Sequence, residues 1–202
     1  MESIMDPVVD VDRAFWYIFI VSALLLTGIT LVMIFFVVRY RRSRHPNPSD
    51  IRDNWKLEVL WTVIPTLIAL SMFMVGWKSY TGMRTVPAGS IQIQVLAQMF
   101  SWIFVYNNDK ESENLLVVPE NTPIKLNIES LDVIHSFYLP AFRVKVDAVK
   151  NFPTYVWFRT QQPGEFDILC AEYCGLDHSK MLGKLKVLSQ KDYENWLEQE
   201  AE

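Results

Sequence analysis

The sequence predicts a membrane-anchored all-β protein, with an N-terminal two-helix transmembrane hairpin followed by a Greek-key β-sandwich or barrel. Two long apolar segments lie within the first 78 residues, and each is long enough to cross a bilayer. From Ser79 onward, short alternating or apolar runs are separated by turn residues, which is typical of β-strands. Half of the 202 residues are hydrophobic, and they are unevenly distributed. This distribution favours a membrane anchor plus one small domain.

The first apolar segment, Ala14–Val38, contains no charged side chain and can span the roughly 30 Å hydrocarbon core with some tilt. Its apolar core is too long for a signal peptide, so we expect it to be retained. The residues before it also differ from the basic start of a signal peptide, with Glu2, Asp6, Asp10 and Asp12 against Arg13.

The second apolar segment is Val59–Trp77. The two predicted spans therefore lie at about 14–38 and 59–77, within an N-terminal region 1–78. Pro46 and Pro48 disfavour a helix at the tip of the hairpin, and Leu57 with Glu58 is predicted to open the second span. Pro65 lies inside this span and predicts a kink, which neighbouring helices can tolerate.

Orientation follows from the loop between the spans, where basic side chains outnumber acidic ones. By the positive-inside rule this loop lies in the cytoplasm or its topological equivalent, so both termini lie outside. A basic cluster can also bind nucleic acid, but its place between two spans favours a topology signal, and we expect no nucleic-acid partner. The charged residues are Arg39, Arg41, Arg42, Arg44, Arg52 and Lys56 against Asp50 and Asp53.

The region 79–202 is expected to form one extracytoplasmic β domain. Ser189 followed by Asp192 resembles a capping box that opens a terminal helix through about Glu200. Turns are expected at residues 107–109 and 161–164. Strands are expected at Ile91–Val95, Trp102–Tyr106, Leu115–Val118, Ile124–Ile128, Tyr155–Arg159, Glu165–Leu169 and Gly183–Leu188.

A metal site is predicted from the only two cysteines, Cys170 and Cys174, with His178 and Met181 close behind and His135 far upstream. Sulfur and imidazole donors suit copper better than magnesium, calcium or manganese. Loops at one end of a sandwich can cluster, so the segment between the last two expected strands can meet His135, which lies between two earlier ones.

The residues leave three readings of this set open. A mononuclear blue-copper site needs a distant His with Cys, His and Met on one loop. In that site Cys170 would not be a ligand. Two thiolates between two histidines could instead bridge two coppers. Without metal, the cysteines could form a disulfide, because disulfides persist outside the cytoplasm.

The motifs DVIHSF and CAEYCGLDHSKM resemble the copper loop of cytochrome c oxidase subunit II. This resemblance implies a cupredoxin-like domain and a binuclear copper centre of the CuA type, bridged by Cys170 and Cys174. His135 and His178 would be terminal ligands, Met181 a weak ligand, and Glu172 a ligand through its backbone carbonyl. The carboxylate of Glu172 would also bind magnesium or manganese at the border with subunit I.

By the same resemblance, the chain accepts electrons from cytochrome c and passes them to haem in subunit I, which reduces oxygen and pumps protons. Its partners would be subunit I, other oxidase subunits and the lipid bilayer. We expect both termini and the copper domain on the outer side, whether periplasmic, extracellular or in the intermembrane space, of what we take to be a bacterial plasma membrane.

Two further roles rest on the resemblance. The pattern E-x-x-W-T-x-x-P from Glu58 resembles the family, in which a glutamate here lies near the mouth of the K proton pathway. The alternative for Glu58 is a solvated carboxylate that the helix dipole favours. Family members often carry Gln followed by an exposed Trp that accepts the electron. Here Met99 follows Gln98, so Trp102 and Phe100 are the candidates, although either could be a core aromatic.

A second departure concerns the family pattern K-x-D-A-x-P-G. It is matched at Lys145, Asp147 and Ala148, but Lys150 and Asn151 stand where Pro-Gly is usual. The resemblance therefore does not predict the conformation of the turn at these two residues.

The region 79–202 has 16 acidic and 11 basic side chains, a net charge of −5 that would steer a basic cytochrome c, or serve only for solubility. Two rival functions remain. One is a metal-free interaction subunit such as that of quinol oxidases, which the intact ligand set disfavours. The other is a membrane-tethered copper carrier, which needs exchangeable metal.

Overall fold

The computed structural model describes residues 7–47 and 53–199. The contacts divide the chain into two compact units: Val11–Ser79, and a β unit that continues from Tyr80 and includes the start of the first helix. Six residues used in the predictions above lie outside the described ranges: Glu2, Asp6, Pro48, Asp50, Arg52 and Glu200.

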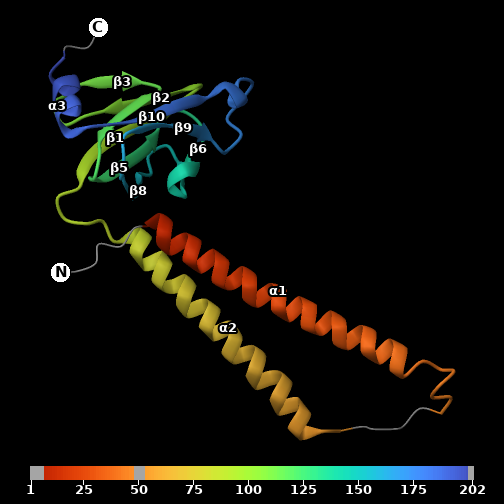
Figure 1. Ribbon diagram of the computed structural model, residues 1–202. Coiled ribbons are helices and arrows are strands. Elements are labelled where there is room, and N and C mark those ends of the chain that lie inside the picture. The colour runs from red at the N-terminus through yellow and green to blue at the C-terminus, as the bar shows by residue number, and fades with distance from the viewer. Residues whose placement is uncertain (1–6, 48–52, 200–202) are drawn as a thin grey trace. The chain divides into compact units, whose positions relative to one another are not determined.

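Two helices, α1 (Pro7–Arg39) and α2 (Trp55–Arg84), are each long and apolar enough to cross a membrane (Figure 1). Most of their large apolar side chains are exposed, as expected for surfaces that face lipid. Both helices extend beyond the predicted apolar spans. A hydrogen bond of 2.7 Å between Tyr17 Oη and Ser71 Oγ joins them.

Helix α2 begins at Trp55, earlier than the predicted opening at Leu57. The reason is Asn54, whose side-chain oxygen accepts a hydrogen bond from Leu57 N at 3.2 Å and so caps the first turn. The helix continues through Pro65. The described part of the hairpin tip before Pro48 contains no helix, as Pro46 predicted.

The β unit contains two five-stranded sheets. One has the order β3-β2-β1-β5-β8 and the other the order β4-β10-β9-β6-β7. The first consists of β1 (Ile91–Gln98), β2 (Ser101–Val105), β3 (Glu111–Glu113), β5 (Pro123–Ser130) and β8 (Thr154–Arg159). The second consists of β4 (Leu115–Pro119), β6 (His135–Leu139), β7 (Val144–Ala148), β9 (Gly164–Cys170) and β10 (Leu182–Leu188).

The sheets pack face to face around one hydrophobic core (Figure 1). Strand pairs are antiparallel except β1 with β5 and β4 with β10, which are parallel. Alternating side chains of β1 and β5 are buried, as the period of two predicted. The predicted β-sandwich is therefore confirmed, and all seven predicted strands are present.

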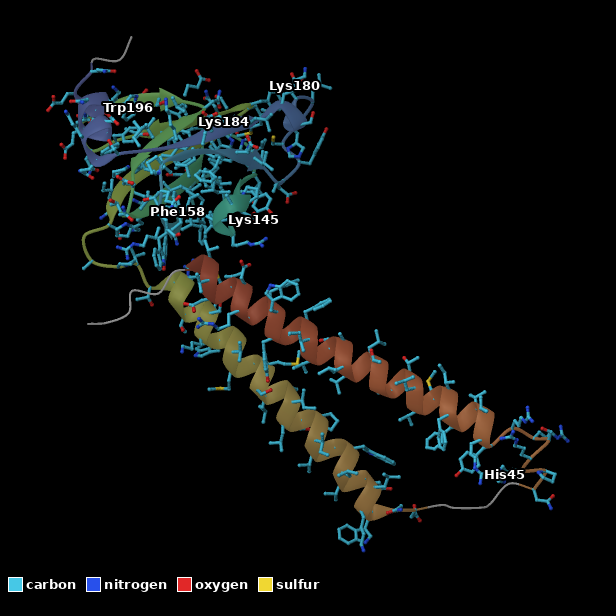
Figure 2. The ribbon with its side chains drawn as sticks, in the orientation of Figure 1. His45, Lys145, Phe158, Lys180, Lys184 and Trp196 are labelled. Atoms are coloured by element: carbon cyan, nitrogen blue, oxygen red, sulfur yellow. The ribbon has the colours of Figure 1, made fainter. Side chains whose placement is uncertain are left out.

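The predicted C-terminal helix is α3 (Gln190–Glu198), and Ser189 is its N-cap. The Ser189 hydroxyl accepts from Asp192 N at 3.2 Å and donates to the Asp192 carboxylate at 2.7 Å. Trp196, labelled in Figure 2, packs edge to face on Tyr106, with ring centroids 5.0 Å apart. Helix α3 thereby covers the edge of the core near β2.

Three strands were not predicted, and each is short, with three to five residues. Strand β3 is three polar residues at a sheet edge. Strand β6 begins with His135 and Ser136, which are polar but fully buried. The expectation that His135 lies on a connection between strands is thus wrong, because it is the first residue of β6. Strand β7 contains the Lys145–Asp147 motif on an exposed edge.

The departure at Lys150–Asn151 has a local explanation. Asn151 adopts a left-handed conformation with φ of 58°, and asparagine tolerates this region better than most residues. Asn151 can therefore support a turn here without glycine.

Candidate metal centre

Antiparallel pairing of β6 and β9 brings the distant histidine to the cysteine loop. Phe137 pairs with Cys170, so the start of β6 lies beside the end of β9. The loop from Ala171 to Met181 leaves β9 and returns into β10. Two backbone hydrogen bonds close its base, from Ala171 N to Ser136 O at 2.9 Å and from Cys170 N to Met181 O at 3.3 Å.

Five side chains that were predicted as ligands converge here. The possible donor atoms of His135, Cys170 and Cys174 all lie within 4.8 Å of one another. The Sγ atom of Cys174 lies 3.6 Å from Nδ1 of His178 and 3.8 Å from Sδ of Met181. His135 and Met181 are fully buried, and Cys174 is 5% exposed.

The sixth predicted ligand also belongs to this cluster. The backbone carbonyl oxygen of Glu172 lies 3.3 Å from Cys170 Sγ, while the Glu172 side chain is exposed. The carbonyl therefore faces the sulfur site, and the carboxylate remains available outside it.

Asp132 fixes the orientation of the His135 ring. Its Oδ1 lies 2.7 Å from His135 Nε2, which leaves Nδ1 directed toward Cys170 Sγ at 4.0 Å. A carboxylate partner on one ring nitrogen is the usual way in which proteins set the tautomer of a metal-binding histidine. Asp132 also accepts from the backbone N–H groups of Met99 at 2.8 Å and Val133 at 2.7 Å.

The surroundings of the site change the pKa values of Asp132 and Cys174. Burial raises the pKa of Asp132, but the hydrogen bonds from His135, Met99 and Val133 outweigh it and leave this pKa below its usual value. Burial, followed by the neighbouring Cys170, raises the pKa of Cys174 to about 11. The Cys174 thiol is therefore protonated at neutral pH without metal, and a metal ion must displace its proton.

The donor set fits copper. The two cysteine sulfurs are 3.9 Å apart, which is far longer than the ~2.05 Å disulfide bond, so they are separate thiols. Metal–thiolate bonds are about 2.3 Å long in zinc sites, so one ion can bind both sulfurs at this separation. Soft sulfur and imidazole donors favour copper over the hard divalent cations.

The two aromatic candidates differ in burial. Trp102 is fully buried, and its ring packs edge to face on Phe137 at 5.4 Å and on His135 at 6.2 Å. Trp102 is therefore a core residue and cannot be the exposed aromatic that the resemblance implies. Phe100 is half-buried and lies against the metal loop, where a Cβ on Gly175 would be 3.1 Å from its ring.

Glu58 is not among the clustered side chains; it is exposed in the first turn of α2. On the metal loop itself, Lys180 (labelled in Figure 2) pairs with Asp177 at 2.7 Å. Sequence reasoning missed Asp132, Met99 and Gly175 as contributors to the site. The i, i+3 spacing of Asp132 and His135 was the one available signal, because a carboxylate so close can reach the ring.

Profiles of one family match most of the chain. That for the cytochrome c oxidase subunit II transmembrane domain matches residues 4–81, and that for the periplasmic domain matches residues 92–187.

Individual relatives agree. An alternative cytochrome c oxidase subunit 2 of Bradyrhizobium diazoefficiens is 28% identical, over 94% of this chain and 78% of the relative. The cytochrome c oxidase subunit 2 of Cereibacter sphaeroides is 25% identical, over 91% of this chain and 73% of the relative.

Two solved structures resemble the β unit. The periplasmic domain of cytochrome oxidase subunit II from Bradyrhizobium japonicum is 30% identical with a TM-score of 0.54, over 56% of this chain and 95% of that one. A mixed disulfide intermediate between a thioredoxin-like protein and subunit II of cytochrome c oxidase gives 30% identity and a TM-score of 0.51, over 56% of this chain and 92% of that one.

Proposed function

The chain belongs to the cytochrome c oxidase subunit II family, and from this premise we propose that it passes single electrons from cytochrome c to haem in subunit I. Two copper ions of the CuA type would be held by His135, Cys170, Cys174 and His178, with Met181 and the Glu172 carbonyl. The observation that supports this most is the convergence of all six donors at one end of the sandwich.

The protein's own residues give this centre its properties. When bound, copper supplies a one-electron couple. Cys170 and Cys174 would hold the copper together with the imidazoles beside them: Cys170 lies near His135, and Cys174 lies near His178. The loop is closed by backbone hydrogen bonds, so its ligands need little rearrangement when the charge changes. Buried surroundings and hydrogen bonds to the ligands tune the potential.

The donor would dock at the metal end. The β unit has eight exposed large apolar side chains in residues 85–199, and all lie on the metal loop or on the loops and strand ends beside it. Exposed apolar patches of this kind mark interaction sites. The net charge of −5 in region 79–202 adds long-range attraction for a basic cytochrome c. The eight residues are Met99, Leu131, Val133, Ile134, Phe152, Tyr173, Leu176 and Leu182.

Two further roles belong to the assembled oxidase. The exposed carboxylate of Glu172 is free to bind magnesium or manganese together with subunit I, since only its backbone carbonyl faces the sulfurs. Glu58, exposed at the start of α2, would lie near the entrance of the K proton pathway.

The proposed topology follows from the charges. Two spans within region 1–78 cross the bilayer, and the basic loop between them stays on the cytoplasmic side. Both termini and region 79–202 then lie on the outer side of a bacterial plasma membrane.

The state of the thiols decides whether metal can bind. A relative was captured in a mixed disulfide with a thioredoxin-like protein. In this chain the two sulfurs are close enough that an oxidising compartment would favour their disulfide, which cannot hold copper. Cys170 and Cys174 therefore need reduction before loading.

Electron uptake separates this function from its rivals. The copper-loaded chain in detergent is mixed with reduced cytochrome c, and haem oxidation is followed by stopped-flow absorbance. We expect haem oxidation together with copper reduction, and copper that resists a chelator. Cys174→Ser should abolish both, whereas Lys186→Ala, an exposed change on β10, should alter neither.

Two outcomes would reject the proposal. Copper that a chelator removes readily, without electron uptake, would indicate a carrier. A chain that binds no copper after reduction of its thiols would indicate a metal-free interaction subunit.

A further inference from the structure

A small cavity lies in the β unit where helix α2 ends. Its volume is about 200 Å³, and it is lined by the last turn of α2, by β7 with the residue before it, and by β8. All of its lining residues belong to the β unit. Three of them are cations, Arg84, Arg143 and Lys145 (labelled in Figure 2), and three are aromatic, Tyr80, Tyr155 and Trp157.

The last turn of α2 is fixed on strand β8. Tyr155 Oη donates a hydrogen bond to the Arg84 carbonyl at 3.1 Å, and Trp157 Nε1 donates to the Gly82 carbonyl at 3.2 Å. The guanidinium carbon of Arg84 lies 4.2 Å from the centroid of the Tyr155 ring. These contacts hold the Arg84 side chain against one wall of the cavity, so the site is already formed in the folded chain.

Positive charge is concentrated here, although region 79–202 is acidic overall. Three of the 11 basic side chains of that region line the cavity, and the Nζ atom of a fourth, Lys125, lies 5.4 Å from the Tyr155 ring centroid. Asp147 offsets part of this charge, at 3.3 Å from Lys145 Nζ. In the described part of the chain, Arg84 and Lys125 contact the Tyr155 ring and pair with no carboxylate. The cavity therefore attracts anions.

The cavity lies at the level of the lipid headgroups if the proposed topology holds. The second apolar segment ends at Trp77, and Tyr80 and Arg84 follow in the same helix. At a rise of about 1.5 Å per residue, these two positions lie about 5 and 10 Å beyond that segment. The headgroup layer is roughly 5–8 Å thick on each side of the hydrocarbon core. Tyr80 is 51% exposed, as expected for the aromatic belt at a membrane surface.

We propose that this cavity binds the phosphate of an anionic phospholipid in the outer leaflet. The inference rests on the proposed topology and goes beyond electron transfer. Arg84 and Arg143 would bind the phosphate oxygens, because a guanidinium presents paired N–H donors to phosphate, and Lys145 would add a point charge. Pockets that enclose whole ligands measure about 300–1,000 Å³. This smaller cavity would take only the headgroup, while the acyl chains stay in the bilayer.

Two observations favour an anionic lipid over a zwitterionic one. An aromatic ring can bind the quaternary ammonium of a choline headgroup, but Arg84 already covers the ring of Tyr155. Basic side chains beside the outer end of a span also run against the positive-inside rule. An anionic headgroup gives these cations a reason to be there.

An acidic segment of a partner subunit is the competing occupant, because the same charges would attract it. The depth of the cavity favours lipid, since phosphates are the abundant anions at the headgroup level. Basic pockets beside membrane spans bind lipid headgroups in other proteins.

The test measures lipid retention by the copper-free full chain in neutral detergent. Native mass spectrometry counts phosphatidylglycerol or phosphatidylcholine molecules per chain as each lipid is added. Wild type should retain phosphatidylglycerol at a several-fold lower lipid concentration than phosphatidylcholine. The double variant Arg84→Gln/Arg143→Gln should raise the phosphatidylglycerol concentration for half-occupancy by about 10-fold or more. Lipid held at the basic loop between the spans is unaffected by this change.

Three controls accompany this variant. Lys186→Gln/Lys191→Gln removes the same charge from exposed positions on β10 and α3, and should leave retention unchanged. Arg84→Lys/Arg143→Lys keeps the charge and should preserve most of the preference. Lys145→Gln leaves the contacts of α2 with β8 intact and should weaken retention by a smaller factor, so a folding defect in the double variant cannot hide the effect.

Inorganic phosphate distinguishes a lipid from a free anion. An excess of it should leave the retained phosphatidylglycerol in place, because the acyl chains hold the lipid in the micelle. Displacement of the lipid by phosphate would overturn the lipid assignment and indicate a site for free anions.

Three other results would overturn the proposal. They are equal retention of the two lipids, an equal loss in Lys186→Gln/Lys191→Gln, and no retention of phosphatidylglycerol by wild type. The last would leave the acidic segment of a partner subunit as the occupant. Because the chain is copper-free, failure of electron transfer would not change these readings. Cysteine labelling from outside the cell tests the topology separately.

Discussion

Two carboxylates fix the start of β6, where the chain presents its first histidine ligand. Asp132 bonds to His135, and Asp147 accepts a hydrogen bond of 2.7 Å from the hydroxyl of Ser136. The His135 ring and the side chain of the next residue, Ser136, are therefore each held by a carboxylate. The ligand geometry depends on groups that bind no metal themselves.

Acid should weaken this arrangement through Asp147. The Ser136 hydrogen bond, against burial and with help from Lys145, lowers the pKa of Asp147. A lowered folded-state pKa contributes stability above the unfolded value of about 3.9, and this stability is lost as pH falls through the folded value. The effect is small, because the side chain is 54% exposed.

Thermal unfolding from pH 6 to pH 3 measures this contribution. Asp147→Asn should lower the melting temperature at pH 6, and the difference from wild type should shrink toward pH 3. Asp167→Asn, on an exposed strand position, is a control for loss of surface charge. A difference that stays constant with pH would contradict the assignment to Asp147 ionisation.

At the scale of elements, the metal loop depends on Gly175. Its φ is 137°, a conformation that side chains disfavour, and a Cβ there would meet the Phe100 ring at 3.1 Å. Gly175→Ala should cost about 1–3 kcal/mol of folding free energy for the backbone alone. It should also speed copper loss to a chelator.

Gly89→Ala is the matched control for this variant. Gly89 also has a positive φ, of 76°, but nothing lies within 4 Å of its Cβ position. It should lose stability without losing copper faster. Equal copper retention by the two alanine variants would show that the contact with Phe100 has no part in holding the loop.

The terminal helix offers a second test at this scale. Ser189→Ala removes the cap of α3 and should lower the free energy of unfolding by about 1 kcal/mol. Lys191→Ala, exposed in the same turn, should change it little. Chemical denaturation in detergent measures both. A loss as large in Lys191→Ala would mean that general helix propensity, not the cap, is responsible.

Sequence patterns predicted the longer and more apolar strands and missed the three short strands β3, β6 and β7. Strand β1 shows a period of two in its sequence, whereas β6 buries the polar residues His135 and Ser136 in succession, because carboxylates outside the strand bond to both. The partnership of Ser136 with Asp147 is visible only in the folded chain, whereas the i, i+3 spacing of Asp132 and His135 was a signal that the sequence offered.

In the candidate site, too, the sequence predicted some residues, while the position of others is known only from the fold. Local spacing identified Cys170, Cys174, His178 and Met181, since the end of β9 and the loop that follows it contain them all. The burial of Trp102 could not be predicted from the sequence, because aromatic residues occur both in cores and in surface contacts.

At the scale of the whole molecule, the basic loop sets the proposed orientation. Single cysteines can be introduced at Ser43 and at Glu113 in a background in which Cys170 and Cys174 are serine. A membrane-impermeant maleimide should label the cysteine at Glu113→Cys in intact cells, and that at Ser43→Cys only after permeabilisation. Labelling of Ser43→Cys in intact cells would contradict the topology.

The central claim is that this chain holds two coppers between two thiolates. The most direct measurement is copper per chain, with the electron paramagnetic resonance spectrum, for the full chain loaded in detergent and for Cys170→Ser. We expect two tightly held coppers that share one unpaired electron, and the loss of this signal in Cys170→Ser. One copper per chain, with a spectrum that Cys170→Ser leaves unchanged, would contradict it.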